Sequence, residues 1–136
     1  MKILVIDDDP AMTELLSLVL APTKAQIFTS NSGEDGLKLV KEQAPDIVLL
    51  DLMMPRMDGL QTTETIRSFS PVPILILSVM DNPGLIARAL DKGADDYLVK
   101  PVPTGILIAH INNLTRRSMG TTIKVVPANI KVTSSL

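Results

Sequence analysis

Three consecutive carboxylates, Asp7, Asp8 and Asp9, follow directly on an apolar run at residues 3–6. Like charges held together repel, so at least one of these carboxyl groups should have a raised pKa unless a cation lies among them. Asp9 precedes Pro10, and that pair is typical of a helix cap followed by the first helical residue. The charge on Asp7 and Asp8 therefore needs a chemical explanation of its own.

Asp51, Ser78 and Lys100 also follow apolar runs further along the chain. Mg²⁺ (or Mn²⁺) prefers carboxylate oxygens, so Asp7, Asp8 and Asp51 together predict a divalent-cation site. Such a cation can bridge to a phosphoryl group and offset its repulsion by the carboxylates. Asp51 is then a candidate nucleophile that forms an aspartyl phosphate, with Lys100 and the Ser78 hydroxyl as partners of the phosphoryl oxygens.

Elements that would bring these side chains together alternate regularly along the chain. Two of the apolar runs are uninterrupted, which is typical of strands buried on both faces of a parallel sheet, and segments of helical length lie between the runs. The predicted strands are 2–6, 26–29, 47–50, 74–77 and 97–99. The predicted helices are 10–20, 33–42, 59–68, 83–92 and 103–117, with Asp9, Ser32 and Asp58 as caps of the first three.

This alternation predicts an α/β fold of flavodoxin-like (βα)5 type, with a doubly wound, five-stranded parallel sheet. Right-handed crossovers favour the strand order 2-1-3-4-5, which places the first strand beside the third. Ligands of such sheets bind beyond the carboxyl ends of the strands. We therefore expect the three carboxylates, the hydroxyl and the ammonium to meet at that one edge.

Composition limits the class of protein. A chain of 136 residues with 46% apolar and 21% charged residues can form one folded domain. There is no apolar run of about 18 residues and no signal-peptide pattern, so we expect a cytoplasmic chain without a membrane partner. The absence of cysteine excludes thiolate metal sites and cysteine nucleophiles. The fifteen acidic residues all lie at or before Asp96, and only basic charges follow.

Four motifs carry a family resemblance over residues 2 to about 117. They are the acidic strand end at 3–10, the segment 45–59 around Asp51, the segment 93–98 that reads Gly-Ala-Asp-Asp-Tyr-Leu, and the segment 99–101 that reads Val-Lys-Pro. Together they resemble the receiver domain of two-component response regulators. The resemblance implies that Asp51 accepts a phosphoryl group from a sensor histidine kinase. The chain would then be a phosphoacceptor that assists its own phosphotransfer and dephosphorylation, and not an enzyme.

The same resemblance implies roles for residues around Asp51. Asp8, Asp51 and the backbone carbonyl of Met53 would bind the metal directly, and Asp7 would act partly through water. Ser78 and Tyr97 would form a switch pair, in which Ser78 moves toward the phosphoryl group and the Tyr97 ring then turns inward. The face made by 83–92, 97–99 and 103–117 would change shape as a result. Lys100 would precede a cis peptide bond at Pro101.

Three apolar residues are expected to tune the site. Met53 and Met80 lie two residues beyond Asp51 and Ser78, and neither side chain can orient an attacking water, so we expect slow self-dephosphorylation. Val79 stands where the family pattern has a small residue, and its branched side chain is expected to narrow the mouth of the pocket.

The segment 93–97 is similar to that of OmpR/PhoB-type transcription factors, which form homodimers through the face described above. Arg88, Asp91, Asp95 and Asp96 are candidates for ion pairs between subunits, although His110 replaces the usual arginine and the last helix carries no acid. We expect a receiver domain at 1–118, followed at 119–136 by a linker or the start of a missing output domain. DNA would be bound only through that output domain.

Other classes of function remain open at this stage. The chain is alternatively a receiver-like scaffold that is never phosphorylated, or a stand-alone receiver in a phosphorelay. A hydrolase with an aspartyl nucleophile would need a second carboxylate near Asp51, where Leu52 and Met53 stand instead. An FMN carrier would share the fold, but no phosphate-cradling loop follows the first strand.

Overall fold

Five parallel strands form a single sheet in the structure, a computed structural model that describes residues 1–119. They pair in the order β2-β1-β3-β4-β5, so the predicted fold class and strand order are confirmed. Three strands are one residue longer than predicted, which adds Ser30, Ser78 and Asp96. The strands are β1 (Lys2–Ile6), β2 (Gln26–Ser30), β3 (Ile47–Leu50), β4 (Ile74–Ser78) and β5 (Asp96–Val99).

The helices begin where the sequence places caps. The side chains of Asp9, Ser32 and Asp58 each accept a backbone N–H in the first turn of the helix that follows, as predicted, and Asn82 does the same for the fourth helix. The helices are α1 (Pro10–Leu20), α2 (Gly33–Gln43), α3 (Gly59–Phe69), α4 (Pro83–Asp91) and α5 (Thr104–Met119), with a short 3₁₀ turn, η1, at Ala21–Thr23. α4 ends one residue earlier than predicted, and α5 begins at Thr104 and runs two residues further.

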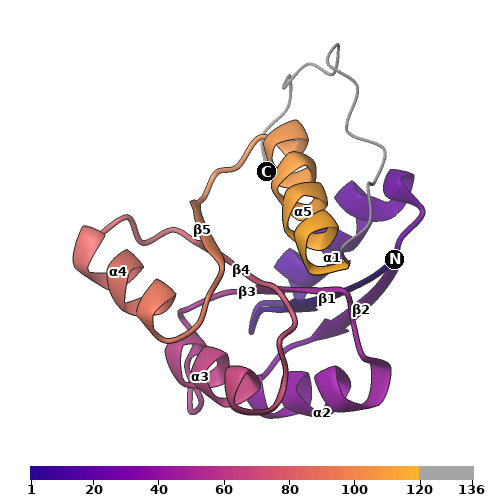
Figure 1. The fold of residues 1–136 in the computed structure, drawn as a ribbon. Coiled ribbons are helices and arrows are strands. Elements are labelled where there is room, and N and C mark those ends of the chain that lie inside the picture. The colour runs from indigo at the N-terminus through magenta and orange to yellow at the C-terminus, as the bar shows by residue number, and fades with distance from the viewer. Residues whose placement is uncertain (120–136) are drawn as a thin grey trace.

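The helices cover the two faces of the sheet (Figure 1). α1 and α5 lie on one face and α2 and α3 on the other, while α4 stands beside β5 at the edge. Each face has its own apolar cluster, one built around Leu16, Leu107 and Ile111 and the other around Ile66 and Tyr97. These two layers hold the strands in register, so the residues at the carboxyl ends of the strands have fixed neighbours.

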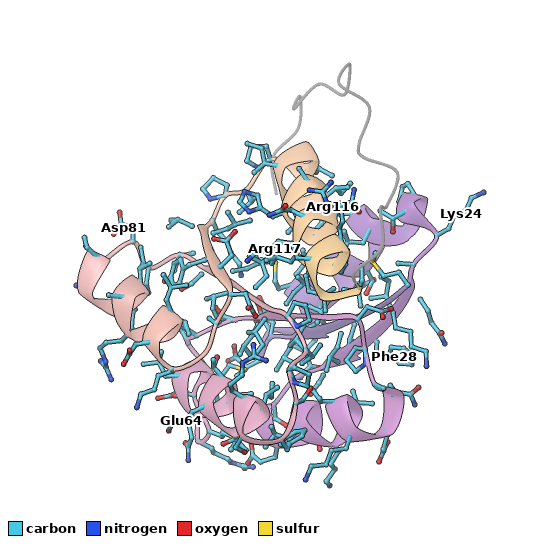
Figure 2. All side chains as sticks on the ribbon, in the orientation of Figure 1. Lys24, Phe28, Glu64, Asp81, Arg116 and Arg117 are labelled. Atoms are coloured by element: carbon cyan, nitrogen blue, oxygen red, sulfur yellow. The ribbon has the colours of Figure 1, made fainter. Side chains whose placement is uncertain are left out.

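α4 is the most exposed of the helices. Ala89 is its one buried residue among those the structure describes, and Leu90 is largely exposed. Lys92, just after α4, forms an ion pair of 3.1 Å with Glu64. Glu64 lies on the outer side of α3 (Figure 2). None of the helices in the described part of the chain is long and apolar enough to cross a membrane.

Candidate functional site

Parallel pairing of β1 and β3 brings the first acidic residues together. Ile6 and Leu50 are register partners, so Asp7 and Asp51, which follow them, lie side by side at the carboxyl edge. One carboxylate oxygen from each of Asp7, Asp8 and Asp51 lies within 4.8 Å of the other two. A set of oxygen donors at this separation suits a hard divalent cation, so the residues present fit Mg²⁺.

The three carboxylates differ in their exposure. Asp7 is buried, Asp51 is partly buried and Asp8 is exposed. This gradient leaves the cluster open to solvent on one side, where water can complete the coordination of a cation.

Lys100 reaches the cluster from the end of β5. Its ammonium lies 3.3 Å from the carboxylate of Asp7, and both side chains are largely buried. Lys100 therefore pairs with Asp7 in the acidic cluster and not with the nearby acids Asp95 and Asp96. Asp95 instead accepts a hydrogen bond of 2.8 Å from Arg67, and Asp96 lies 2.6 Å from the ring of His110.

Burial and the neighbouring charges of the cluster shift the pKa of Asp51. Burial is the main cause that raises its pKa to about 6, and the negative charge of Asp7 raises it further. The ammonium of Lys100 and the backbone N–H of Met53 act in the opposite direction without cancelling the shift. The sequence predicts a raised pKa among Asp7, Asp8 and Asp9, whereas the structure places the raised pKa at Asp51. A cation at the carboxylates would favour the ionised form.

Ser78 and Tyr97 both bond to Met80, in the loop after β4. Ser78 is fully buried, and its hydroxyl oxygen accepts a hydrogen bond of 3.1 Å from the Met80 N–H. The hydroxyl of Tyr97 donates to the Met80 carbonyl at 2.6 Å, and the ring packs in the apolar cluster that also contains Ile66 of α3 and Ala89 of α4. The Tyr97 ring thus lies inside the chain, in the inward position that the switch expected from the sequence would use. Burial of the ring together with its bonded hydroxyl stabilises the inward position.

The apolar residues at the rim are largely exposed. Met53 and Val79 are 57% and 67% exposed, and Met80 is 36% exposed, so solvent reaches all three. Val79 lines an apolar cleft of about 270 Å³ beside Met12 and Pro101, on the α1 side of the site. The Lys100–Pro101 peptide bond is cis, as the resemblance implies.

Sequence reasoning missed Asn31, which follows β2. Its side-chain amide donates a hydrogen bond of 2.8 Å to the backbone carbonyl of Asp7 and one of 3.3 Å to the hydroxyl of Thr13. Its place after a strand that neighbours β1 was a signal available in the sequence, but an asparagine in a polar loop is common enough to hide it.

A family model and the curated relatives both point to response regulators. Residues 3–112 match the model of the response regulator receiver domain. The chain is 41% identical to the transcriptional regulatory protein AfsQ1 of Streptomyces coelicolor over 116 residues, which are 85% of this chain and 52% of that protein. It is 40% identical to the response regulator MprA of Mycobacterium leprae over 87% of this chain and 52% of that protein. The chain therefore spans about half the length of these curated relatives.

Solved structures agree with this fold. The receiver domain of Francisella response regulator 1452 superimposes with a TM-score of 0.80 at 30% identity, over 86% of this chain and 98% of that one. The BeF3-activated N-terminal receiver domain of Klebsiella pneumoniae RstA gives a TM-score of 0.82 at 28% identity, over 85% and 99% of the two chains.

Proposed function

This chain belongs to the family of response regulator receiver domains, and from that premise we propose that phosphorylation of Asp51 in the presence of Mg²⁺ switches it between two signalling states. The phosphoryl donor is a sensor histidine kinase. One observation supports the proposal above the others. Asp51 lies beside Asp7 and Asp8 at the carboxyl edge of the sheet, with Lys100 at the same point.

Each residue of the site has a part in the transfer. A carboxylate oxygen of Asp51 forms a bond to phosphorus while the N–P bond of the donor phosphohistidine breaks and its nitrogen keeps the electron pair. Lys100 pairs with the phosphoryl oxygens. Asp7, Asp8, Asp51 and the backbone carbonyl of Met53 would hold Mg²⁺, which supplies positive charge against the phosphoryl oxygens. The chain assists its own phosphorylation and dephosphorylation in this way and is not an enzyme for another substrate.

The switch acts through the loop after β4. A phosphoryl group on Asp51 attracts the Ser78 hydroxyl, whose oxygen accepts a hydrogen bond from the Met80 N–H in this structure. Loss of that bond shifts the loop that also holds Tyr97, and the shift reaches the face made by α4, β5 and α5.

The output of the switch is transcription, through a DNA-binding domain outside this chain. The relatives MtrA and AfsQ1 are named as a DNA-binding response regulator and a transcriptional regulatory protein, and this supports the assignment. A homodimer would form through α4, β5 and α5, where Asp95 and Asp96 already have the partners Arg67 and His110 within the chain. We place the protein in the cytoplasm, where sensor kinases present their phosphohistidine.

The test is phosphorylation by a small donor, read as intact mass. The chain is incubated with Mg²⁺ and acetyl phosphate beside Asp51→Asn, a metal-free sample and Asp81→Asn as a matched control. Asp81 lies just before α4, outside the acidic cluster (Figure 2). We expect one added phosphoryl group on the wild type and on Asp81→Asn, and none in the other two samples.

A negative result has a second step, because Val79 lies at the rim and can exclude a small donor. If the wild type gains no phosphoryl group, binding of beryllium fluoride with Mg²⁺ is measured next. Failure of both would contradict phosphorylation at Asp51 and favour the scaffold that is never phosphorylated.

A further inference from the structure

Asn31 lies in the loop between β2 and α2, next to the acidic end of β1. Its side-chain amide donates to the backbone carbonyl of Asp7 at 2.8 Å. Asn31 is 24 residues away from Asp7 along the chain, so this bond exists only because β2 and β1 are neighbours in the sheet.

The carbonyl that Asn31 holds belongs to the peptide group between Asp7 and Asp8. A peptide group is planar, so the direction of its carbonyl also sets the direction in which the chain continues to Asp8. The Asp7 side chain has two further anchors, since its carboxylate accepts from the Asp9 N–H at 3.0 Å and from Lys100 at 3.3 Å. Within residues 1–119 the Asp8 carboxylate has no hydrogen-bond partner, so the backbone is what positions it.

Thr13 connects the same amide to α1. Thr13 is buried, and its hydroxyl donates to the Pro10 carbonyl at 3.0 Å while it accepts from Asn31 at 3.3 Å. Asn31 therefore joins the loop after β2, the end of β1 and the first turn of α1. These three segments surround the Asp7–Asp8 peptide.

We propose that Asn31 is a positioning residue for the divalent-cation site, which it acts on by holding the Asp7–Asp8 peptide and hence the Asp8 carboxylate. The inference rests on the proposed function, because it assigns Mg²⁺ to the acidic cluster. Mg²⁺ requires near-octahedral geometry and tolerates small displacements of its ligands poorly. Groups that orient metal ligands typically change affinity by about 10- to 100-fold when they are lost. Because Asn31 acts through the backbone, we expect a smaller loss of about three- to tenfold.

The first experiment measures binding of Mg²⁺ to the unphosphorylated chain, by following amide chemical shifts in a titration. Asn31→Leu keeps a side chain of similar size and removes both hydrogen bonds, and Asn31→Ala removes the side chain altogether. Asn113→Ala is the matched control, because Asn113 lies on α5 and accepts from Arg116 away from the cluster. Thermal unfolding of each variant identifies a temperature at which all of them are folded.

We expect Asn31→Leu and Asn31→Ala to raise the Mg²⁺ dissociation constant about three- to tenfold, with Asn113→Ala unchanged. Thr13→Val, which removes one of the two acceptors of the amide, should give an intermediate increase, and Thr13→Ser should restore wild-type binding.

A second readout separates positioning from general damage. The rate of phosphorylation by acetyl phosphate is measured against Mg²⁺ concentration, and Asn31→Leu should need more Mg²⁺ for half of its maximal rate while the maximal rate changes less than twofold. An unchanged Mg²⁺ dissociation constant in both Asn31 variants would overturn the inference and leave the proposed function standing. A wild-type chain that binds no Mg²⁺ would overturn the metal site of the proposed function, and the inference with it.

Discussion

At the scale of single residues, Asp51 is the group whose charge the fold leaves uncompensated. Burial and the charge of Asp7 raise its pKa to about 6, although Lys100 lies at the same edge of the sheet. At neutral pH Asp51 is therefore ionised in the metal-free chain, although burial and the charge of Asp7 destabilise its charged form. Binding of a cation beside Asp51, or transfer of a phosphoryl group to it, should therefore be favoured because each replaces a destabilised free carboxylate.

The first prediction concerns the dependence of stability on pH without divalent metal. Between about pH 4 and pH 6 the folded chain keeps the Asp51 proton that the unfolded chain releases, so the free energy of unfolding falls as pH rises through this range. Above about pH 6 the free energy of unfolding does not fall further from this cause. A shift of about two pKa units corresponds to about 3 kcal/mol, which solvent screening of this partly exposed group reduces to about 1–2 kcal/mol.

Urea unfolding in EDTA at pH 4 to 8 measures this effect. Asp51→Asn should be about 1–2 kcal/mol more stable than the wild type at pH 8 and should lose this advantage toward pH 4. The control Asp81→Asn should follow the wild type. Equal stability of Asp51→Asn and the wild type at pH 8 would contradict the assignment of the penalty to Asp51.

The second prediction concerns the lifetime of the phosphorylated chain. The thioether of Met53 and that of Met80 can neither take a proton from an attacking water nor orient it, so we expect slow loss of the phosphoryl group. Met53→Glu, which puts a carboxylate at the rim, should shorten the half-life about tenfold or more. Leu18→Glu is the control, because Leu18 is also an exposed apolar residue but lies on α1, and it should not change the half-life. Loss is followed by intact mass over time, and a wild-type half-life of seconds would contradict the prediction.

At the scale of elements, Arg67 connects the end of α3 to the turn between α4 and β5. Its guanidinium donates to the carbonyls of Ser70, Val72 and Gly93 and to the carboxylate of Asp95, at 2.8–3.0 Å. Gly93 has a φ of 120°, and a Cβ there would lie 2.9 Å from the Arg67 side chain, so glycine suits this turn on both counts. One side chain thus aligns the turn from which β5 starts.

The third prediction follows from these contacts. Arg67→Met keeps the apolar stem but leaves the carbonyls without a donor, so we expect a loss of about 2–4 kcal/mol in the free energy of unfolding. Arg67→Lys should recover only part of it, because an ammonium cannot reproduce the planar fork of donors. Arg88→Met, on the exposed side of α4, is the control and should stay within about 0.5 kcal/mol of the wild type. A similarly small effect of Arg67→Met would show that these hydrogen bonds contribute little.

At the scale of the whole molecule, the acidic site exists only in the folded sheet. Asp8 and Asp51 are 43 positions apart in the sequence, and they meet because β1 and β3 are register partners. A cation that binds this cluster therefore binds the folded chain and stabilises it against unfolding.

The fourth prediction is a rise in thermal stability with Mg²⁺. At a concentration about 100 times the dissociation constant, a ligand of the folded state alone adds about 2.7 kcal/mol to the free energy of unfolding. The midpoint of thermal unfolding should therefore rise with Mg²⁺ at pH 8 in the wild type, and much less in Asp51→Asn. NaCl at matched ionic strength controls for screening. An equal rise in NaCl would mean that general screening, rather than a bound cation, stabilises the chain.

The sequence by itself determined the elements and the chemistry at the ends of the strands. Apolar periodicity and local caps depend on residues a few positions apart, so the strands, the helices and the roles of Asp9, Ser32 and Asp58 at helix starts could be predicted to within a residue or two. The meeting of Asp7 with Asp51 followed from the alternation of strands and helices, because the topology of such sheets has few solutions.

The tertiary structure alone decided which polar groups are partners. Lys100 bonds to Asp7 across 93 positions, Arg67 to Gly93 across 26, and Asn31 to Asp7 across 24. Hydrogen bonds need donor and acceptor within a few tenths of an ångström, and side-chain packing between distant segments sets that distance. Such packing is not encoded in local sequence patterns, so these hydrogen-bond partners could be identified only in the folded chain.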